Sequence, residues 1–303
     1  MNILLTGGTG FVGRELSSCS FIKKHVVRKG TVHPYSCVYG IESLNGTTDW
    51  SGAFIDIDTI IHLAGLAHSN SFSQYEYKSV NVEGTLHLAS EAAKAGVKRF
   101  VFVSSAGVNG LSTNGSLFKP NSTPSPHNLY TQSKYNAEIG LNKISLETGL
   151  EVVIVRPTLV YGVNAPGNFG MLVKLIKYLP VLPFGLTANK RDFIAVHNLA
   201  HLLIACATHP NADGHIFLAS DGVPVSTKEF TNAIGEGLGK TLLQLPVPVS
   251  LMNLVARLFG KSAMAGQLLG DLQVDSSNVQ KILGWVPPYT MRQAMALLST
   301  KNI

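Results

Sequence analysis

Short apolar runs alternate with longer helix-like segments over the first half of the chain, and the runs end at Gly, Ser or Asn. This alternation is typical of βαβ units, in which helices connect the buried strands of a parallel sheet. Buried strands are expected at Asn2–Thr6, Thr59–Ala64, Phe100–Ser104 and Val152–Arg156, and helices at Glu83–Ala95 and Thr131–Glu147. The predicted fold class is α/β, with a Rossmann-type doubly wound parallel sheet.

The pattern changes after Pro157. The spacing of apolar residues becomes less regular, and Pro and Gly become more frequent, notably in Ala165–Gly170 and Leu179–Gly185. We therefore expect residues 1–162 to form the sheet domain. Residues 163–303 are expected to form mainly a smaller C-terminal lobe, with some segments returning to the sheet. A chain of 303 residues is long enough for both parts to share a sizeable core.

Composition narrows the class of protein. Hydrophobic residues make up 45% of the chain and charged residues 14%, as in a compact globular protein. The longest apolar stretches, near Ile60–Leu66 and Leu242–Leu258, are interrupted before they reach the roughly 18 residues that a membrane span needs, so no transmembrane segment is expected. The N-terminus enters a strand directly, without the pattern of a secretory signal, and we expect a cytoplasmic protein.

Charge and cysteine content exclude further classes of site. Cys19, Cys37 and Cys206 are widely spaced and form no metal-ligand pattern, so neither a disulfide framework nor a metal site is expected. The formal net charge of +6 suits an anionic ligand and is equally compatible with an ordinary basic surface. The densest basic cluster, within Lys23–Lys29, is too small for a nucleic-acid interface, so no nucleic-acid partner is expected.

The first strand leads into a glycine-rich turn, Gly7-Gly8-Thr9-Gly10-Phe11-Val12-Gly13. Gly7 permits the tight turn, Gly10 lets the backbone approach a pyrophosphate, and Gly13 allows the following helix to pack closely. The helix that begins at Phe11 and Val12 offers unpaired N–H groups to an anion. The turn therefore predicts that residues 1–162 bind a dinucleotide.

Arg28 follows the second predicted strand, at the position where NAD-binding folds usually carry an acidic residue for the ribose hydroxyls. A guanidinium there can pair with the 2′-phosphate of NADP, although a solvated surface arginine is the alternative. The helix before this strand is unusually short, so its length does not fix the position of Arg28. The choice between NAD and NADP therefore stays open.

The catalytic candidates are Tyr130, Lys134 and Ser105. Tyr130 and Lys134 are four residues apart, so a helix places both on one face. A nearby ammonium and an oxidised nicotinamide would both lower the phenol pKa from its usual ~10, and Lys134 can also hold the nicotinamide ribose. Ser105 is expected to face the reacting oxygen, and Ser104 is expected to be a strand-end residue.

At these residues the chain resembles the extended short-chain dehydrogenase/reductase family. The resemblance also rests on the segments His62-Leu63-Ala64-Gly65, Asn81-Val82-Glu83-Gly84-Thr85 and Arg156-Pro157-Thr158-Leu159-Val160-Tyr161-Gly162. It implies that the cofactor NAD(P)(H) is lined by Leu63, Ala64, Gly65 and Pro157, and that Asn81 buttresses the site. The alternatives are a buried core histidine at His62 and a helix-capping role for Asn81.

Within this family, the chain resembles bacterial reductases of UDP-2-acetamido-2,6-dideoxy-4-ketohexose, which form UDP-N-acetylquinovosamine for surface polysaccharides. This resemblance rests on residues 104–110, 167–169, 182–185, 189–191, 274–278 and 283–285. It implies a UDP-sugar substrate and allows a homodimer. The implied substrate-binding residues are His68, Ser105, Asn109, Asn168 and Arg191. For Arg191, an ion pair with Asp192 or another carboxylate is the alternative, and Gln267 stands where a second basic residue is often expected.

The leading hypothesis is reduction, in which NAD(P)H delivers a hydride to a keto carbon 4 while Tyr130 protonates the alkoxide and Ser105 donates a hydrogen bond to it. A UDP-hexose or UDP-N-acetylhexosamine 4-epimerase would use the same residues. Dehydration is not expected, because Ala106-Gly107 replaces the Asp-Glu pair of dehydratases. A non-catalytic dinucleotide-sensing regulator is the alternative of another class. Finally, the amphipathic Val249–Leu258 segment is expected to pack in the lobe rather than on a membrane surface.

Overall fold

A parallel sheet of seven strands forms the centre of the molecule, in the order β10-β6-β5-β4-β1-β2-β3. The computed structural model describes residues 1–67, 72–113 and 115–300. The sheet strands are β1 (Ile3–Thr6), β2 (Ile22–Arg28), β3 (Val38–Ile41), β4 (Thr59–His62), β5 (Arg99–Val103), β6 (Glu151–Pro157) and β10 (Ile216–Ala219). Because β2 and β4 flank β1 on opposite sides, the strand order reverses at the carboxyl end of β1, where α/β sheets form their ligand crevice.

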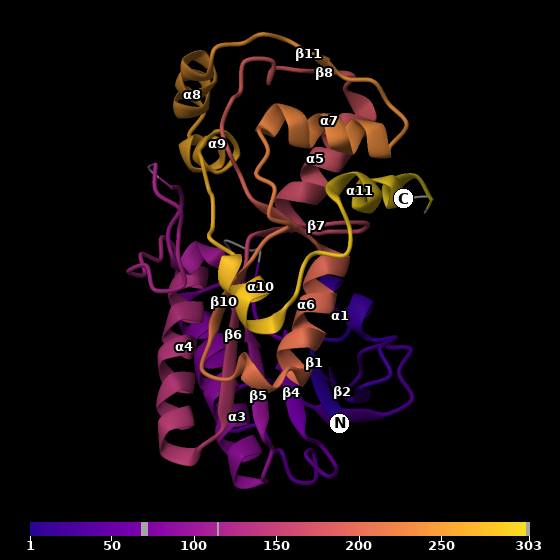
Figure 1. The fold of residues 1–303 in the computed structure, drawn as a ribbon, viewed down its shortest axis with the longest axis vertical. Helices are drawn as coiled ribbons and strands as arrows, with labels where there is room; N and C mark the ends of the chain where they lie inside the picture. The colour runs from indigo at the N-terminus through magenta and orange to yellow at the C-terminus, as the bar shows by residue number, and fades with distance from the viewer. Residues whose placement is uncertain (68–71, 114, 301–303) are drawn as a thin grey trace.

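Helices cover both faces of this sheet (Figure 1). The helices associated with the sheet are α1 (Phe11–Leu16), α2 (Gln74–Tyr77), the π-helix η1 (Lys78–Gly84), α3 (Thr85–Lys94), the 3₁₀ helix η2 (Ala106–Val108), α4 (Leu129–Thr148), α6 (Val196–Thr208), the 3₁₀ helix η3 (Pro210–Ala212) and α10 (Ser277–Leu283). Helices α3 and α4 pack together on one face, and α1 and α6 pack together on the other. The fold is therefore the predicted doubly wound α/β sheet.

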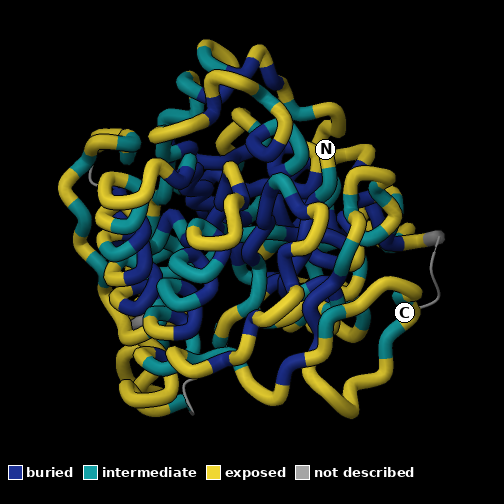
Figure 2. The backbone as a smooth tube through the Cα atoms, turned by 90° about the horizontal axis from the view of Figure 1, so that it is seen from below, coloured by how far each residue is buried: buried dark blue, intermediate teal, exposed yellow. Residues whose placement is uncertain are grey.

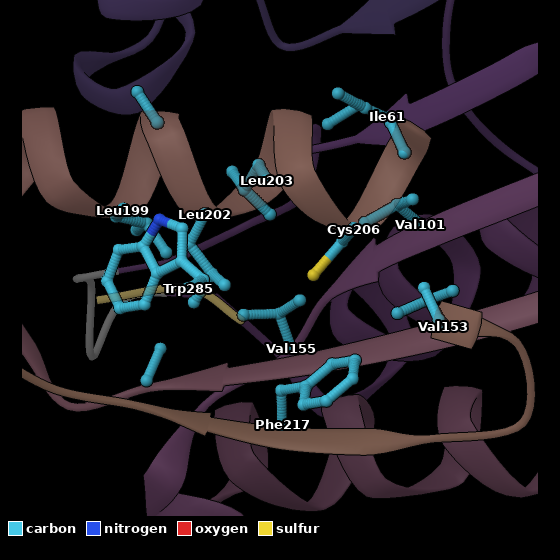
Figure 3. Close-up of a cluster of buried hydrophobic side chains, with 14 of the residues drawn as sticks. Ile61, Val101, Val153, Val155, Leu199, Leu202, Leu203, Cys206, Phe217 and Trp285 are labelled. Atoms are coloured by element: carbon cyan, nitrogen blue, oxygen red, sulfur yellow. The ribbon is translucent and has the colours of Figure 1, made fainter. Parts of the chain in front are cut away.

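The sheet has a hydrophobic core on each of its faces, because successive side chains of a strand point to opposite faces. In β6, Val153 and Val155 belong to the core against α6, while Val152 and Ile154 belong to the core against α3 and α4. Figure 3 shows part of the α6 core, with Trp285 beside the helix. Buried segments fill the interior of the molecule and exposed segments surround them (Figure 2).

The four strands predicted from the apolar runs are present, with ends that differ from the predictions by one or two residues. Strand β4 ends at His62, earlier than expected, and Leu63–Gly65 form the turn beyond the strand. The helix expected at Glu83–Ala95 is part of a longer helical run that begins with α2 and η1. The second expected helix corresponds to α4.

The remaining elements form a lobe that lies above the sheet in Figure 1. They are β7 (Leu159–Tyr161), α5 (Gly167–Tyr178), β8 (Val181–Leu182), β9 (Phe193–Ala195), α7 (Thr227–Gly237), β11 (Leu243–Gln244), α8 (Val249–Leu258), α9 (Ser262–Leu269) and α11 (Met291–Thr300). Its core contains aromatic and aliphatic side chains, and the rings of Phe193 and Phe230 stack with centroids 3.8 Å apart. Segments after residue 163 also return to the sheet, where β10 pairs with β6.

Helix α8 packs against the lobe along one side only, so the packing expected from the sequence is partial. None of its residues is buried, and its leucines are exposed. Only one side of the helix is half-buried, where Met252 contacts the lobe core. Among the described residues, no helix is both long and apolar enough to cross a membrane.

Candidate active site

The glycine-rich turn lies at the carboxyl end of β1. Gly7 has a φ of +72°, which only glycine adopts without strain. A Cβ on Gly13 would lie 2.2 Å from the carbonyl oxygen of Gly7, and a Cβ on Gly7 would lie 2.8 Å from the backbone nitrogen of Ala64. Gly10 precedes α1, whose first residues are Phe11 and Val12. The absence of side chains thus leaves a backbone-lined turn that fits a dinucleotide pyrophosphate.

The turn after β4 connects this glycine-rich turn to the catalytic helix. The Ala64 N–H donates to the Thr6 hydroxyl at 3.2 Å. A Cβ on Gly65 would lie 3.0 Å from Asn81 Oδ1 and 3.5 Å from Lys134 Nζ. The structure therefore brings together three of the predicted features, namely the glycine-rich turn, the segment Leu63–Gly65 and Lys134.

Asn81 holds these parts in place. Its Oδ1 accepts a hydrogen bond from the Leu66 N–H (2.7 Å), and its Nδ2 donates to the Leu66 carbonyl (3.0 Å). The same amide donates to Ser133 Oγ at 2.9 Å, and the Ser133 hydroxyl donates to the Tyr130 carbonyl at 2.7 Å. The Asn81 side chain thus links the turn after β4 to the first turn of α4, which agrees with the supporting role that the family resemblance implied.

His62 is a buried core histidine. Its Nδ1 lies 2.8 Å from Thr6 Oγ1 and its Nε2 lies 3.0 Å from Thr85 Oγ1. Burial, with a smaller contribution from the Lys134 charge, lowers the pKa of His62 to about 3, so the ring is neutral at physiological pH. The side chain ties β1 and β4 to α3 beneath the site.

Helix α4 positions Tyr130 and Lys134. The helix begins after Asn128, whose side chain accepts a hydrogen bond from the Thr131 N–H at 2.8 Å in a reciprocal capping box. The Lys134 ammonium donates to the Val103 carbonyl at 2.9 Å and lies 4.7 Å from the centre of the Phe102 ring. Burial lowers the pKa of Lys134 to about 8, partly opposed by the charge of Glu138.

The expected lowering of the Tyr130 pKa is not found in the protein alone. Burial raises the pKa of Tyr130 to about 12, and neighbouring Tyr77 adds to the increase. Burial is the main cause, and the Lys134 ammonium donates to a carbonyl of β5. The Tyr130 side chain of the protein alone is therefore protonated at neutral pH and can donate its proton.

Two serines follow β5, and they have different partners. Ser104 is buried, and its hydroxyl donates to Glu138 Oε1 at 2.5 Å. Ser105 is half-buried and caps η2, where its Oγ accepts a hydrogen bond from the Gly107 N–H at 3.1 Å. The Ser105 hydroxyl proton remains available for a substrate oxygen, so Ser105 stays the predicted catalytic serine.

A buried ionic network lies behind these serines. Glu138 on α4 accepts hydrogen bonds from Arg156 on β6, and Arg156 also donates to Asn109 Oδ1 at 3.1 Å. Asn109 is 2% exposed, and its amide donates to the Lys119 carbonyl at 3.4 Å. The structure thus places Asn109 in an internal network, and its predicted contact with the sugar stays a prediction.

The ribose end of the crevice contains residues that the sequence analysis missed. Arg28 is exposed at the end of β2, where it was expected. Tyr35 folds back and donates from its hydroxyl to the Gly8 carbonyl at 2.5 Å, and its ring stacks on His25 at 3.7 Å between centroids. A stack between a strand residue and the following loop has no sequence pattern, so only the loop's aromatic content could have indicated it.

Two of the predicted substrate residues of the lobe, Asn168 and Arg191, donate hydrogen bonds to residues at the end of α9. Arg191 is 7% exposed and donates to the Gly270 carbonyl at 2.7 Å, while Asp192 accepts a hydrogen bond from the Val274 N–H. Burial lowers the pKa of Arg191 to about 10. Asn168 is exposed and donates to Gln267 Oε1 at 3.0 Å. His68 lies outside the described residues.

A family model describes most of this arrangement. The model of the NAD dependent epimerase/dehydratase family matches residues 3–219. The chain belongs to this family. The match includes the glycine-rich turn, Ser105, Tyr130, Lys134 and Pro157, which ends β6. The family's NAD dependence agrees with the backbone-lined turn, and bound NAD would be held by that turn and by the segment Leu63–Gly65.

Members of the family are similar to the chain over nearly its full length. "UDP-glucose 4-epimerase" of Vibrio cholerae is 38% identical, covering 99% of the chain and 97% of the relative. "N-acetyl-alpha-D-glucosaminyl-diphospho-ditrans,octacis-undecaprenol 4-epimerase" of Escherichia coli O157:H7 is 26% identical, covering 97% and 93%. The crystal structure of UDP-glucuronic acid 4-epimerase from Bacillus cereus in complex with NAD has a TM-score of 0.75 at 19% identity, covering 97% and 96%. That structure shares the fold.

Proposed function

We propose that the protein is an NAD-dependent 4-epimerase of a UDP-sugar. The observation that carries this proposal is the 38% identity to the Vibrio cholerae UDP-glucose 4-epimerase, which extends over 99% of the chain. It reverses the order of the two hypotheses drawn from the sequence, in which reduction came first. The lack of an acid–base pair beside Ser105, where Ala106 and Gly107 follow, agrees with a reaction that eliminates no water.

The chain's own groups can perform the proton transfers of such a reaction. Bound NAD would supply a hydride acceptor and donor at carbon 4 of the sugar. Tyr130 would take the proton of the 4-hydroxyl and return it after the keto-sugar has rotated to present its opposite face. Ser105 would donate a hydrogen bond to the same oxygen. Lys134, already held by Val103, would favour the phenolate once its charge and that of the oxidised nicotinamide face Tyr130.

The experiment is to incubate the purified protein with UDP-glucose, UDP-galactose, UDP-N-acetylglucosamine and UDP-N-acetylgalactosamine separately, without added NAD(P)H, and to analyse the products by chromatography. Interconversion of a 4-epimer pair with no net cofactor consumption is expected. Tyr130→Phe should lower turnover at least ~100-fold, because it removes the transferred proton while preserving the ring. Tyr75→Phe, at an exposed tyrosine, is the matched control.

The second candidate is a 4-ketoreductase that forms UDP-N-acetylquinovosamine or its 4-epimer. The resemblance of residues 104–110 and 274–278 to such reductases favours it. This reaction consumes one NAD(P)H for each 4-keto sugar reduced. Stoichiometric NAD(P)H oxidation with a UDP-4-keto-sugar, together with no interconversion of the four UDP-hexoses, would replace the epimerase by the reductase.

A further inference from the structure

Helix α8 turns most of its apolar residues, including all of its leucines, toward solvent. Its half-buried side consists of Val249, Met252 and Ala256. Its exposed side carries four apolar residues at i, i+3, i+4 and i+7, namely Leu251, Leu254, Val255 and Leu258, which are 48%, 53%, 45% and 76% exposed. An amphipathic helix in a soluble domain normally has the opposite orientation, because burying the apolar stripe is what stabilises it. An exposed apolar stripe of this kind is typical of an interaction surface.

The apolar surface continues beyond the helix. Phe259, directly after α8, is 75% exposed, and Met264 on α9 is 49% exposed. We call Leu251, Leu254, Val255, Leu258 and Phe259 the leucine face. A hollow of about 450 Å³ between α8 and α9 is lined by Leu254, by Arg257 and by the polar side chains of Ser250, Asn253 and Ser262. Apolar and cationic groups thus lie side by side at this end of the lobe.

Two segments of the lobe contain basic residues and no acidic ones, although α7 between them carries Glu229 and Glu236. Residues 163–191 and 237–270 contain seven Lys and Arg residues and no Asp or Glu, so they hold more positive charge than the +6 of the whole chain. Two of these cations, Arg257 and Lys261, flank the leucine face and are exposed. Figure 1 shows α5, α8 and α9, which belong to these segments, together in the same lobe. The partner of this surface must therefore accept both leucine side chains and positive charge.

We propose that the leucine face docks onto the surface of an anionic phospholipid bilayer. A helix that lies in the plane of the interface inserts apolar side chains among the acyl chains, while flanking cations pair with anionic headgroups. A second copy of the chain would bring two faces of equal positive charge together. Nucleic acid would offer phosphates to the cations but leave the leucines in water. The bilayer satisfies both properties of the face.

The proposal is tested by sedimentation of the full chain with vesicles of phosphatidylcholine alone, and with vesicles that also contain phosphatidylglycerol. Binding to the second kind of vesicle only is expected. The double variant L254Q/L258Q should lower the partition coefficient at least tenfold, because both residues belong to the inserted face. L146Q is the matched control, since Leu146 is 89% exposed at the far end of α4. The double variant R257Q/K261Q should lower the partition coefficient about fivefold for each cation, whereas K98Q/K143Q should not.

Circular dichroism and UDP-sugar turnover establish that each variant is folded, because none of these residues belongs to the candidate active site. The proposal is overturned by equal binding to both kinds of vesicle, by no binding to either, or by binding that L254Q/L258Q leaves intact. It is also overturned if the chain is an oligomer that L254Q/L258Q dissociates, because a second copy then covers the face.

Discussion

Arg156 and Glu138 form a buried ion pair, with Arg156 Nη2 2.5 Å from Glu138 Oε2 and side chains that are 2% and 3% exposed. The pair joins β6 to α4, and Glu138 lies one helical turn after Lys134. Ser104 at the end of β5 also donates to Glu138. The pair thus fixes the catalytic helix against the strand ends from which Ser105 and Pro157 project.

Glu138→Gln should destabilise the protein by about 3 to 5 kcal/mol, because it leaves the Arg156 charge buried without its counter-ion. The free energy of unfolding, measured by urea titration, tests this. Glu147→Gln on the same helix is the matched control. Its exposed ion pair with Lys143 is worth at most about 0.5 kcal/mol. A loss at position 138 as small as that at position 147 would show that the buried pair does not anchor α4.

His62→Gln should change how stability depends on pH. The folded-state pKa of His62 is lowered to about 3, so this residue's contribution to stability is fully present above the unfolded pKa of 6.5. Below pH 6.5 the unfolded state binds a proton that the folded state does not. Stability then falls by up to about 1.4 kcal/mol per pH unit down to pH 3. The difference in unfolding free energy between wild type and variant should show this slope between pH 6.5 and 3, and should be flat from pH 7 to 8. A flat difference throughout would contradict a buried neutral ring.

Arg28→Ala should weaken NADPH binding about tenfold more than NADH binding, since only NADPH carries the 2′-phosphate that the guanidinium could bind. Fluorescence titration of the folded variant with each reduced cofactor measures the two affinities. Lys29→Ala is the control at the neighbouring position, because Lys29 already pairs with Glu42 at 2.8 Å. Equal small changes for both cofactors would identify Arg28 as an ordinary surface residue.

Arg191→Ala should weaken UDP binding and raise the KM for the nucleotide sugar, with little change in kcat. Arg191 is buried, donates to the Gly270 carbonyl and has further N–H donors for a pyrophosphate at a distance from the reacting carbon. Lys should rescue binding only in part, because an ammonium lacks the planar bidentate donor. Calorimetric titration with UDP tests this, with the exposed neighbour Lys190→Ala as the control. Unchanged UDP affinity at position 191 would refute the phosphate role.

The features that the sequence predicted are local in the chain. The glycine-rich turn, the strand before it and the Tyr130–Lys134 spacing each depend on residues within a few positions, so pattern and propensity identify them. The pairing of Glu138 with Arg156 spans 18 residues, and the contact of Asn81 with Ser133 spans 52. Such pairs depend on the register between elements, which periodicity does not contain.

The orientation of α8 and the direction of the Lys134 ammonium also depend on contacts between elements that are distant in the sequence. The amphipathic segment Val249–Leu258 forms helix α8. Its pattern could not indicate which side faces the lobe, because both sides carry apolar residues. For Tyr130, the four-residue spacing predicted a shared helix face with Lys134, but the direction of the ammonium depends on the Val103 carbonyl, which only the packed structure provides.

The π-helical turn η1 has a geometric consequence for the helical run that contains it. In an α-helix, residues four apart drift roughly 40° around the axis, so three residues spaced by four would spread over about 80°. A π-helical turn contains more residues than an α-helical turn. Residues four apart in it therefore fall short of a full turn, whereas in an α-helix they exceed it. Tyr77, Asn81 and Thr85, which are spaced by four along this helical run, are all buried. One strip of a single helical run thus reaches Tyr130, the Leu66 turn and His62 in succession.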